Sequence, residues 1–145
     1  MLLAIAVLCT PASPEPLKRI GDRGAMLYLL HCSGCHGRTG RGVPASGVPR
    51  FDCLFLNILH HPEGKKYAVN VAGVRNADLS DAEISEVMNH LANAFCTPPR
   101  SSEPAVFWPE LIAELRDEGL DAVQLRKRIE MDLKATGLDY PAYPW

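Results

Sequence analysis

Apolar residues recur at helical spacing along most of the chain, and no segment convincingly alternates apolar and polar residues as a β-strand would. The clearest helix begins after Ser80, which forms a capping box with Glu83, and runs to about Ala94. Its apolar stripe consists of Ile84, Val87, Met88, Leu91 and Phe95. We therefore predict an all-α protein in which this helix is the best-defined element.

The same pattern indicates helices elsewhere, at about residues 22–32, 51–59, 108–117 and 121–135. The segment at 51–59 is mostly apolar, which predicts a short buried helix. Residues 34–49 have the glycine and proline content of a loop, and we also predict a loop over 62–78. Met26 and Met88 lie on helices and are predicted to be core residues.

Length and composition fit one domain with extensions, because the chain has 145 residues, 47% of them hydrophobic and 22% charged. The formal net charge of -2 gives no general attraction to nucleic acid, so no nucleic-acid partner is predicted. An apolar run from Leu2 to Leu8 precedes small residues and prolines, which is typical of the end of a secretory signal cleaved after Ala12. We interpret residues 1–17 as a signal-like segment and linker, too short to be a transmembrane span. The protein is predicted to be periplasmic or otherwise extracytoplasmic.

Two of the five cysteines lie in the motif Cys32-Ser-Gly-Cys35-His36. Haem c forms when two thiols add to the vinyl groups of haem, and two cysteines at this spacing after a helix can reach both vinyls. The histidine that follows then points its imidazole at the iron. A structural zinc site needs a second ligand pair, and the sequence has no second Cys-x-x-Cys. A thioredoxin-like pair needs a preceding strand, whereas a helix is predicted here.

Around this motif the chain resembles the class I c-type cytochromes, over about residues 18–97. Gly24 and Tyr28 resemble the glycine and aromatic residue of the family's N-terminal helix. Pro49 matches a proline whose carbonyl accepts a hydrogen bond from the ligand histidine, a contact that fixes the imidazole tautomer. Residues 79–84 and the helix that follows them resemble the family's C-terminal helix.

The resemblance implies an all-α, cytochrome c-like domain at 18–97 around one covalently bound haem c, followed by a helical extension at 98–145. It implies that Cys32 and Cys35 tether the haem and that His36 is an axial iron ligand. It also implies electron transfer with redox partner proteins such as a dehydrogenase, an oxidase or another cytochrome.

The sequence departs from the family at the second axial ligand. Class I cytochromes usually carry a methionine before the last helix, and the matching position falls near Val71, in a segment without methionine. His60 or His61 is a candidate for this sixth position, although both also fit surface histidines at a helix end. We favour an iron without a sixth protein ligand. His90 stands where the family usually has an aromatic residue, and it is predicted to pack where the two terminal helices cross.

The missing methionine keeps three functions open. Electron transfer is the first and is favoured over an enzymatic role. The second is binding or sensing of a small ligand such as a gas at an open iron. The third is a peroxidase-like activity, which needs a distal acid–base group. Cys53 and Cys96 lie outside the haem motif, and the sequence fits either a disulfide or two free thiols.

Overall fold

The computed structural model describes residues 19–96, 104–116 and 119–138. Their regular structure is helical, with α1 (Arg19–His31), α2 (Ser33–His36), the 3-10 turn η1 (Pro44–Ser46), α3 (Cys53–His60), α4 (Gly64–Asn70), α5 (Ala72–Arg75), α6 (Asp81–Ala94), α7 (Pro109–Arg116) and α8 (Ala122–Ala135). No strand occurs within these ranges, where one isolated antiparallel bridge joins Val43 and Val48. The prediction of an all-α protein is therefore confirmed.

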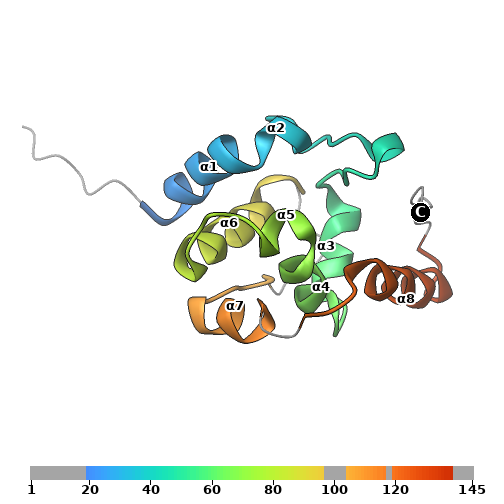
Figure 1. Ribbon diagram of the computed structural model, residues 1–145. Helices are drawn as coiled ribbons and strands as arrows, with labels where there is room; N and C mark the ends of the chain where they lie inside the picture. The colour runs from blue at the N-terminus through green and yellow to red at the C-terminus, as the bar shows by residue number, and fades with distance from the viewer. Residues whose placement is uncertain (1–18, 97–103, 117–118, 139–145) are drawn as a thin grey trace, which may run out of the picture.

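The helices pack around one hydrophobic core, which includes residues of α7 and α8. α1 lies against α6, and α6 lies against α7 (Figure 1). α4 is central, because α3, α7 and α8 all contact it. Ile112 of α7 and Leu125 and Ile129 of α8 are fully buried. The described part of the C-terminal region thus shares its core with the segment that contains the Cys32–His36 motif.

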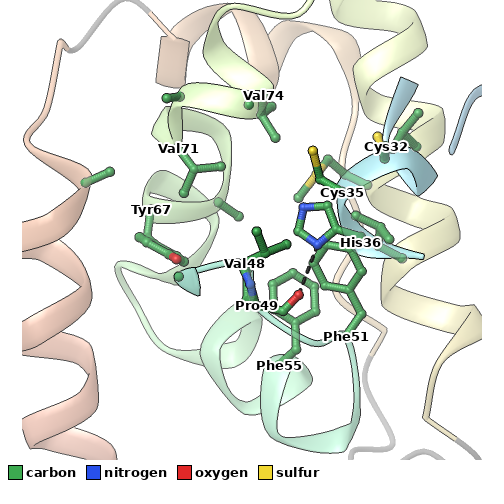
Figure 2. A pocket seen from close by; sticks show the side chains of 18 of the residues that line it. Cys32, Cys35, His36, Val48, Pro49, Phe51, Phe55, Tyr67, Val71 and Val74 are labelled. Atoms are coloured by element: carbon green, nitrogen blue, oxygen red, sulfur yellow. Dashed lines mark hydrogen bonds between the residues drawn. The ribbon is translucent and has the colours of Figure 1, made fainter. Parts of the chain in front are cut away.

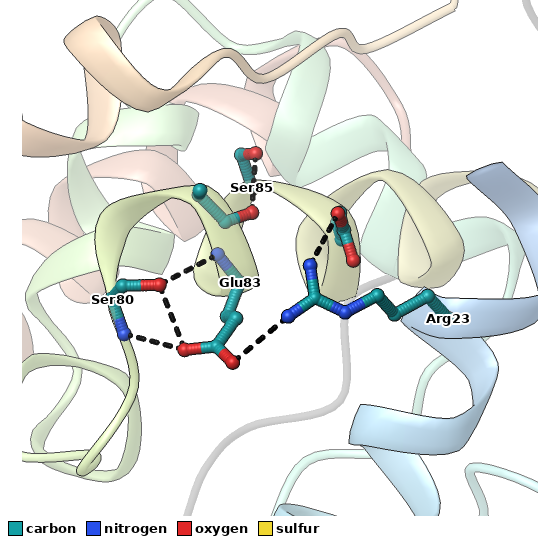
Figure 3. A network of polar contacts seen from close by, with 6 residues as sticks. Arg23, Ser80, Glu83 and Ser85 are labelled. Carbon is teal, nitrogen blue, oxygen red and sulfur yellow. Dashed lines mark hydrogen bonds and ion pairs between the residues drawn. The ribbon is translucent and has the colours of Figure 1, made fainter. Parts of the chain in front are cut away.

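Helix α6 begins as the sequence predicts, with Ser80 as its N-cap. The Ser80 hydroxyl accepts a hydrogen bond from the Glu83 N–H at 3.3 Å, and the Glu83 carboxylate accepts one from the Ser80 N–H at 3.0 Å (Figure 3). Arg23 of α1 forms ion pairs with Glu83 and Glu86, each at 3.0 Å. Because these pairs are open to solvent, they add little stability, and apolar packing holds α1 against α6.

The closest approach of α1 and α6 is at Gly24. A Cβ atom at this position would lie 2.4 Å from the carbonyl oxygen of Glu86, so a larger residue must push the helices apart. One turn further on, the ring of Tyr28 lies 5.7 Å from the His90 ring and 5.4 Å from the Phe95 ring. His90 therefore packs at the crossing, as predicted, and burial lowers its pKa.

The loop predicted at residues 62–78 is wrong, because this segment contains α4 and α5. The buried residues at the end of α4 are consecutive, from Tyr67 to Asn70, since three other helices contact it. Consecutive burial produces no apolar stripe at helical spacing, so periodicity could not reveal this helix. Gly64 begins α4 where a Cβ atom would overlap the carbonyl oxygen of Ile58.

Other predicted elements change in detail. The loop predicted at 34–49 contains α2 and the 3-10 turn, and the two tail helices are present as α7 and α8. Met88 is buried as predicted, but Met26 is 50% exposed, so its prediction as a core residue is wrong. The signal-like segment at 1–17 lies outside the described residues.

A disulfide bond joins Cys53, the first residue of α3, to Cys96, two residues after α6 ends. The bond answers the question that the sequence left open between a disulfide and two free thiols. Its two cysteines are 43 positions apart, so it restricts the unfolded chain and contributes about 2–4 kcal/mol to stability. It also anchors α3 directly after the segment that contains Pro49.

We predict that Gly24→Val destabilises the protein by about 1–3 kcal/mol, because its side chain must be forced into the packed crossing of α1 and α6. Gly73→Ala is the matched control, since a Cβ atom at Gly73 meets nothing within 4 Å. Urea unfolding followed by circular dichroism measures both free energies of unfolding. Equal stability of the two variants would contradict the close crossing.

Candidate functional site

A cavity of about 410 Å³ lies between the Cys32–His36 motif on one side and α4 and α5 on the other (Figure 2). Its lining comes from the motif, the loop after it, helices α3 to α6 and the first turn of α8. Most of the lining side chains are apolar. A mostly apolar cavity of this size with a few polar groups is typical of a cofactor site.

The motif occupies the turn where α1 ends and α2 begins. The Cys32 N–H donates to the Tyr28 carbonyl at 2.9 Å, and the His36 N–H donates to the Cys32 carbonyl at 3.0 Å. This turn places Cys32, Cys35 and His36 together on the cavity wall. Neither thiol forms a disulfide bond, and Cys35 is exposed whereas Cys32 is partly buried. Burial raises the pKa of Cys32, with a further contribution from Cys35, so this thiol stays protonated.

The loop after the motif folds back onto the His36 ring. The Gly42 N–H donates to the His36 carbonyl at 2.8 Å, and Gly42 has a positive φ of 57°. A Cβ atom on Gly42 would lie 2.3 Å from the Pro49 carbonyl oxygen, so glycine allows the two ends of the loop to meet. The Phe51 ring stacks on the His36 ring with 4.3 Å between centroids. The imidazole is therefore held between Pro49 and Phe51.

The two nitrogens of His36 have different roles. Nδ1 lies 3.0 Å from the Pro49 carbonyl oxygen, which only accepts, so Nδ1 carries the hydrogen. In the neutral ring the other nitrogen, Nε2, then has a free lone pair, and Figure 2 shows it on the cavity side. Burial lowers the pKa of His36 more than the bond to Pro49 raises it, which favours this neutral form.

The wall across the cavity from His36 is aliphatic. Figure 2 shows Val71 and Val74 there, and Ala72 and Gly73 of α5 also line the cavity. Val71 is the position where the cytochrome pattern leads one to look for a methionine. The structure therefore places this position at the cavity, but with a side chain that cannot ligate a metal.

Neither His60 nor His61 is among the residues that line the cavity. The Nδ1 of His60 lies 2.7 Å from the Leu56 carbonyl oxygen of its own helix, and the His60 side chain is exposed. The Nε2 of His61 lies 3.2 Å from the Asp132 carboxylate of α8. This arrangement corrects the expectation that one of them reaches the sixth position and fits the alternative of histidines at a helix end.

Sequence reasoning missed the contributions of Tyr67 and α8 to the cavity. Tyr67 is buried and lines it, as do Ala122 and Val123 in the first turn of α8. The consecutive burial at the end of α4 hid Tyr67. The available signal for α8 was its N-cap, Asp121, whose carboxylate accepts hydrogen bonds from the N–H groups of Val123 and Gln124. This cap fixes which residues form the first turn.

A buried ion pair docks α8 beside the cavity. Arg126 Nε lies 2.5 Å from the Glu130 carboxylate, and the two residues are only 3% and 8% exposed. The Arg126 guanidinium lies over the Tyr67 ring, 5.4 Å from its centroid, and Nη1 is 3.5 Å from the phenol oxygen. Burial raises the pKa of Tyr67 although Arg126 opposes the shift, so the phenol stays protonated.

Comparison with known proteins agrees with the features of this cavity. The chain is 29% identical to cytochrome c-552 of Thermus thermophilus over 130 residues, which covers 77% of this chain and 98% of that protein. A second cytochrome c-552, from a specified strain of Thermus thermophilus, is also 29% identical over 130 residues, with 77% and 86% of the two chains covered. These matches support a c-type cytochrome. They also support the predicted cytochrome c-like fold and haem c as its covalent cofactor. The chain matches no protein-family model.

We predict that Arg126→Leu destabilises the protein by about 3–5 kcal/mol, because it leaves the Glu130 carboxylate buried without its partner. The double variant Arg126→Leu/Glu130→Leu is the matched control and should recover most of the loss, since it removes both charges. Urea unfolding measures the free energies. A single variant as stable as the double variant would show that the ion pair is not buried as described.

Proposed function

We propose that the protein is a monohaem c-type cytochrome that transfers electrons, with Cys32 and Cys35 attaching the haem and His36 ligating the iron. One observation carries this proposal: two free thiols and the Nε2 of a hydrogen-bonded histidine line the same apolar cavity. Haem c, when bound, supplies an iron that changes between the ferric and ferrous states. The count of one haem is supported by Cys53 and Cys96, which are joined to each other.

The residues around the motif suit this role. The hydrogen bond from His36 to the Pro49 carbonyl fixes the imidazole orientation and raises its basicity as a ligand. Apolar residues such as Phe55, Val87 and Leu91 line the cavity and exclude water. A water-poor surrounding disfavours the extra positive charge of the ferric iron, so it raises the reduction potential.

The same geometry leaves a route for electrons to a partner. Cys35 is exposed while it lines the cavity, so a haem attached there has an edge at the surface. Met26, Leu29 and Leu30 on the preceding helix are 50%, 42% and 69% exposed and offer an apolar contact surface. A dehydrogenase, an oxidase or another cytochrome is the class of partner that such a carrier serves.

We assign residues 18–97 to the haem domain and residues 98–145 to an extension that completes its core. The signal-like segment at 1–17 supports a periplasmic or other extracytoplasmic location, and the disulfide fits an oxidising compartment. Among the described residues, no helix has the length and apolar character needed to cross a membrane.

The two alternative functions are supported unequally. A peroxidase-like activity needs an acid–base group on the far side of the iron. His60 and His61, the candidates from the sequence, do not line the cavity, so this alternative loses its support. Binding of a small ligand is favoured by the aliphatic wall at Val71 and Val74.

We predict that Cys32→Ala/Cys35→Ala abolishes covalent haem attachment, because both thioether sulfurs are lost. Haem staining of a denaturing gel measures this. Cys53→Ser/Cys96→Ser is the matched control, since it also removes two sulfur atoms but not from the cavity, and it should keep the stain. Staining of the first variant, or no staining of the wild type, would contradict the proposal.

For electron transfer, we predict a reversible one-electron couple of the holoprotein in cyclic voltammetry. Val87→Thr should lower the midpoint potential by roughly tens of millivolts, because a hydroxyl dipole in the cavity stabilises the ferric state. Val106→Thr is the control, as Val106 is 45% exposed and does not line the cavity. An irreversible response, or equal shifts in both variants, would be inconsistent with a carrier whose potential is set by this cavity.

A further inference from the structure

We propose that the sixth coordination position of the iron is open to an external, uncharged diatomic ligand such as carbon monoxide or nitric oxide, and that Val123 of α8 controls its access. This inference rests on the proposed haem attachment at Cys32, Cys35 and His36. It goes further by assigning a ligand class and by giving the C-terminal helix a part in the site.

The first step is a survey of ligating atoms. Among the described residues that line the cavity, those that could ligate iron from a side chain and lie outside the segment from His31 to His36 are Tyr67 and Met88. The wall facing the Nε2 of His36 carries Val71 and Val74 instead (Figure 2). Met88 belongs to α6, where it lines the cavity beside Val87 and is 1% exposed.

Tyr67 is held in the wrong state for a ligand. Its phenol oxygen lies 3.5 Å from Nη1 of Arg126, and the guanidinium lies over its ring. The phenol is buried and retains its proton, whereas a tyrosine ligand of iron is a phenolate. The docking of α8 therefore holds Tyr67 in the wall as a neutral, packed side chain.

The wall itself is short and fixed. Only residues 71–80 connect α4 to α6, and four of them form α5. Arg116 of α7 donates to the Arg75 carbonyl at 2.9 Å and forms an ion pair with Asp81 at 3.0 Å. Arg75 in turn donates to the Leu120 carbonyl at 3.5 Å. A connection this short and tied to the C-terminal region cannot swing a distant side chain onto the iron.

The chemistry of the wall selects the ligand. Valine, alanine and glycine side chains provide no hydrogen-bond donor that would stabilise a charged or strongly polarised ligand. The free N–H groups at the start of α8 are also occupied, because those of Val123 and Gln124 donate to the Asp121 carboxylate at 3.0 and 3.1 Å. Anions such as azide therefore find no compensation for lost hydration, whereas a neutral diatomic ligand requires none.

Val123 stands at the entrance to this space. It lines the cavity and is 40% exposed, so it lies at the rim, where α8 faces solvent. Met131 lies on the same helix, is 63% exposed and does not line the cavity. These two positions give a matched pair for testing access, because a large side chain at either one remains at the surface.

The experiment uses the purified holoprotein, reduced with dithionite and mixed with carbon monoxide in a stopped-flow spectrometer. We expect a high-spin reduced spectrum that shifts on carbon monoxide binding. Val123→Trp should slow the association about tenfold, equivalent to a barrier raised by about 1.4 kcal/mol, and Met131→Trp should leave it unchanged. Azide added to the ferric protein should leave the spectrum unchanged at concentrations far above those at which carbon monoxide saturates.

Each contrary result overturns a defined part. A low-spin reduced spectrum that ignores carbon monoxide would overturn the open position, and recovery of binding in Met88→Leu would identify Met88 as the ligand. Equal association rates in both tryptophan variants would overturn the role of Val123, and tight azide binding would overturn the selection for uncharged ligands. Absence of covalent haem on a denaturing gel would instead overturn the proposed function.

Discussion

The hydrogen bond between His36 and the carbonyl of Pro49 is the constraint on which the site depends. It fixes which ring nitrogen faces the cavity, and it requires the loop from Gly37 to Phe51 to return to its starting point. The return is possible because Gly42 has a backbone conformation and a bare Cα that let the two ends of the loop touch. The stacking of Phe51 on the imidazole then joins the loop to the core. A single backbone acceptor thus links local turn geometry to the chemistry of the cavity.

The sequence was most informative where the structure is local. The capping box at Ser80 located the start of α6 to the residue, and the Cys32–His36 spacing located the side chains that line the cavity. Both depend on contacts between residues close in the chain. The pattern was least informative for α4, whose buried positions are consecutive because neighbours surround it. It also could not place His60 and His61, since their directions depend on how α3 packs, nor reveal that Val123 meets the cavity from more than fifty residues beyond Tyr67.

The C-terminal region is integrated with the rest by two different kinds of interaction. Apolar residues such as Ile112 and Ile129 extend the common core and supply most of the stability. Arg116 and Arg126 add direction, since each reaches particular oxygen atoms on other elements. Apolar contacts alone would allow α7 and α8 to slide along the core. The arginines restrict that freedom, so the cavity wall at α5 and its rim at α8 keep a defined spacing.

The disulfide between Cys53 and Cys96 also bears on how the protein matures. The described residues contain four cysteines, of which two must be oxidised to each other while the other two must stay reduced until they acquire haem. Any bond that engages Cys32 or Cys35 withdraws a sulfur from thioether formation. Oxidative folding and haem attachment therefore compete for the same pool of sulfur atoms. The fold separates the two outcomes by location, because α3 and α6 bring one pair within bonding distance at their ends while the other pair waits at the cavity. Chain topology acts here as a sorting device for thiols.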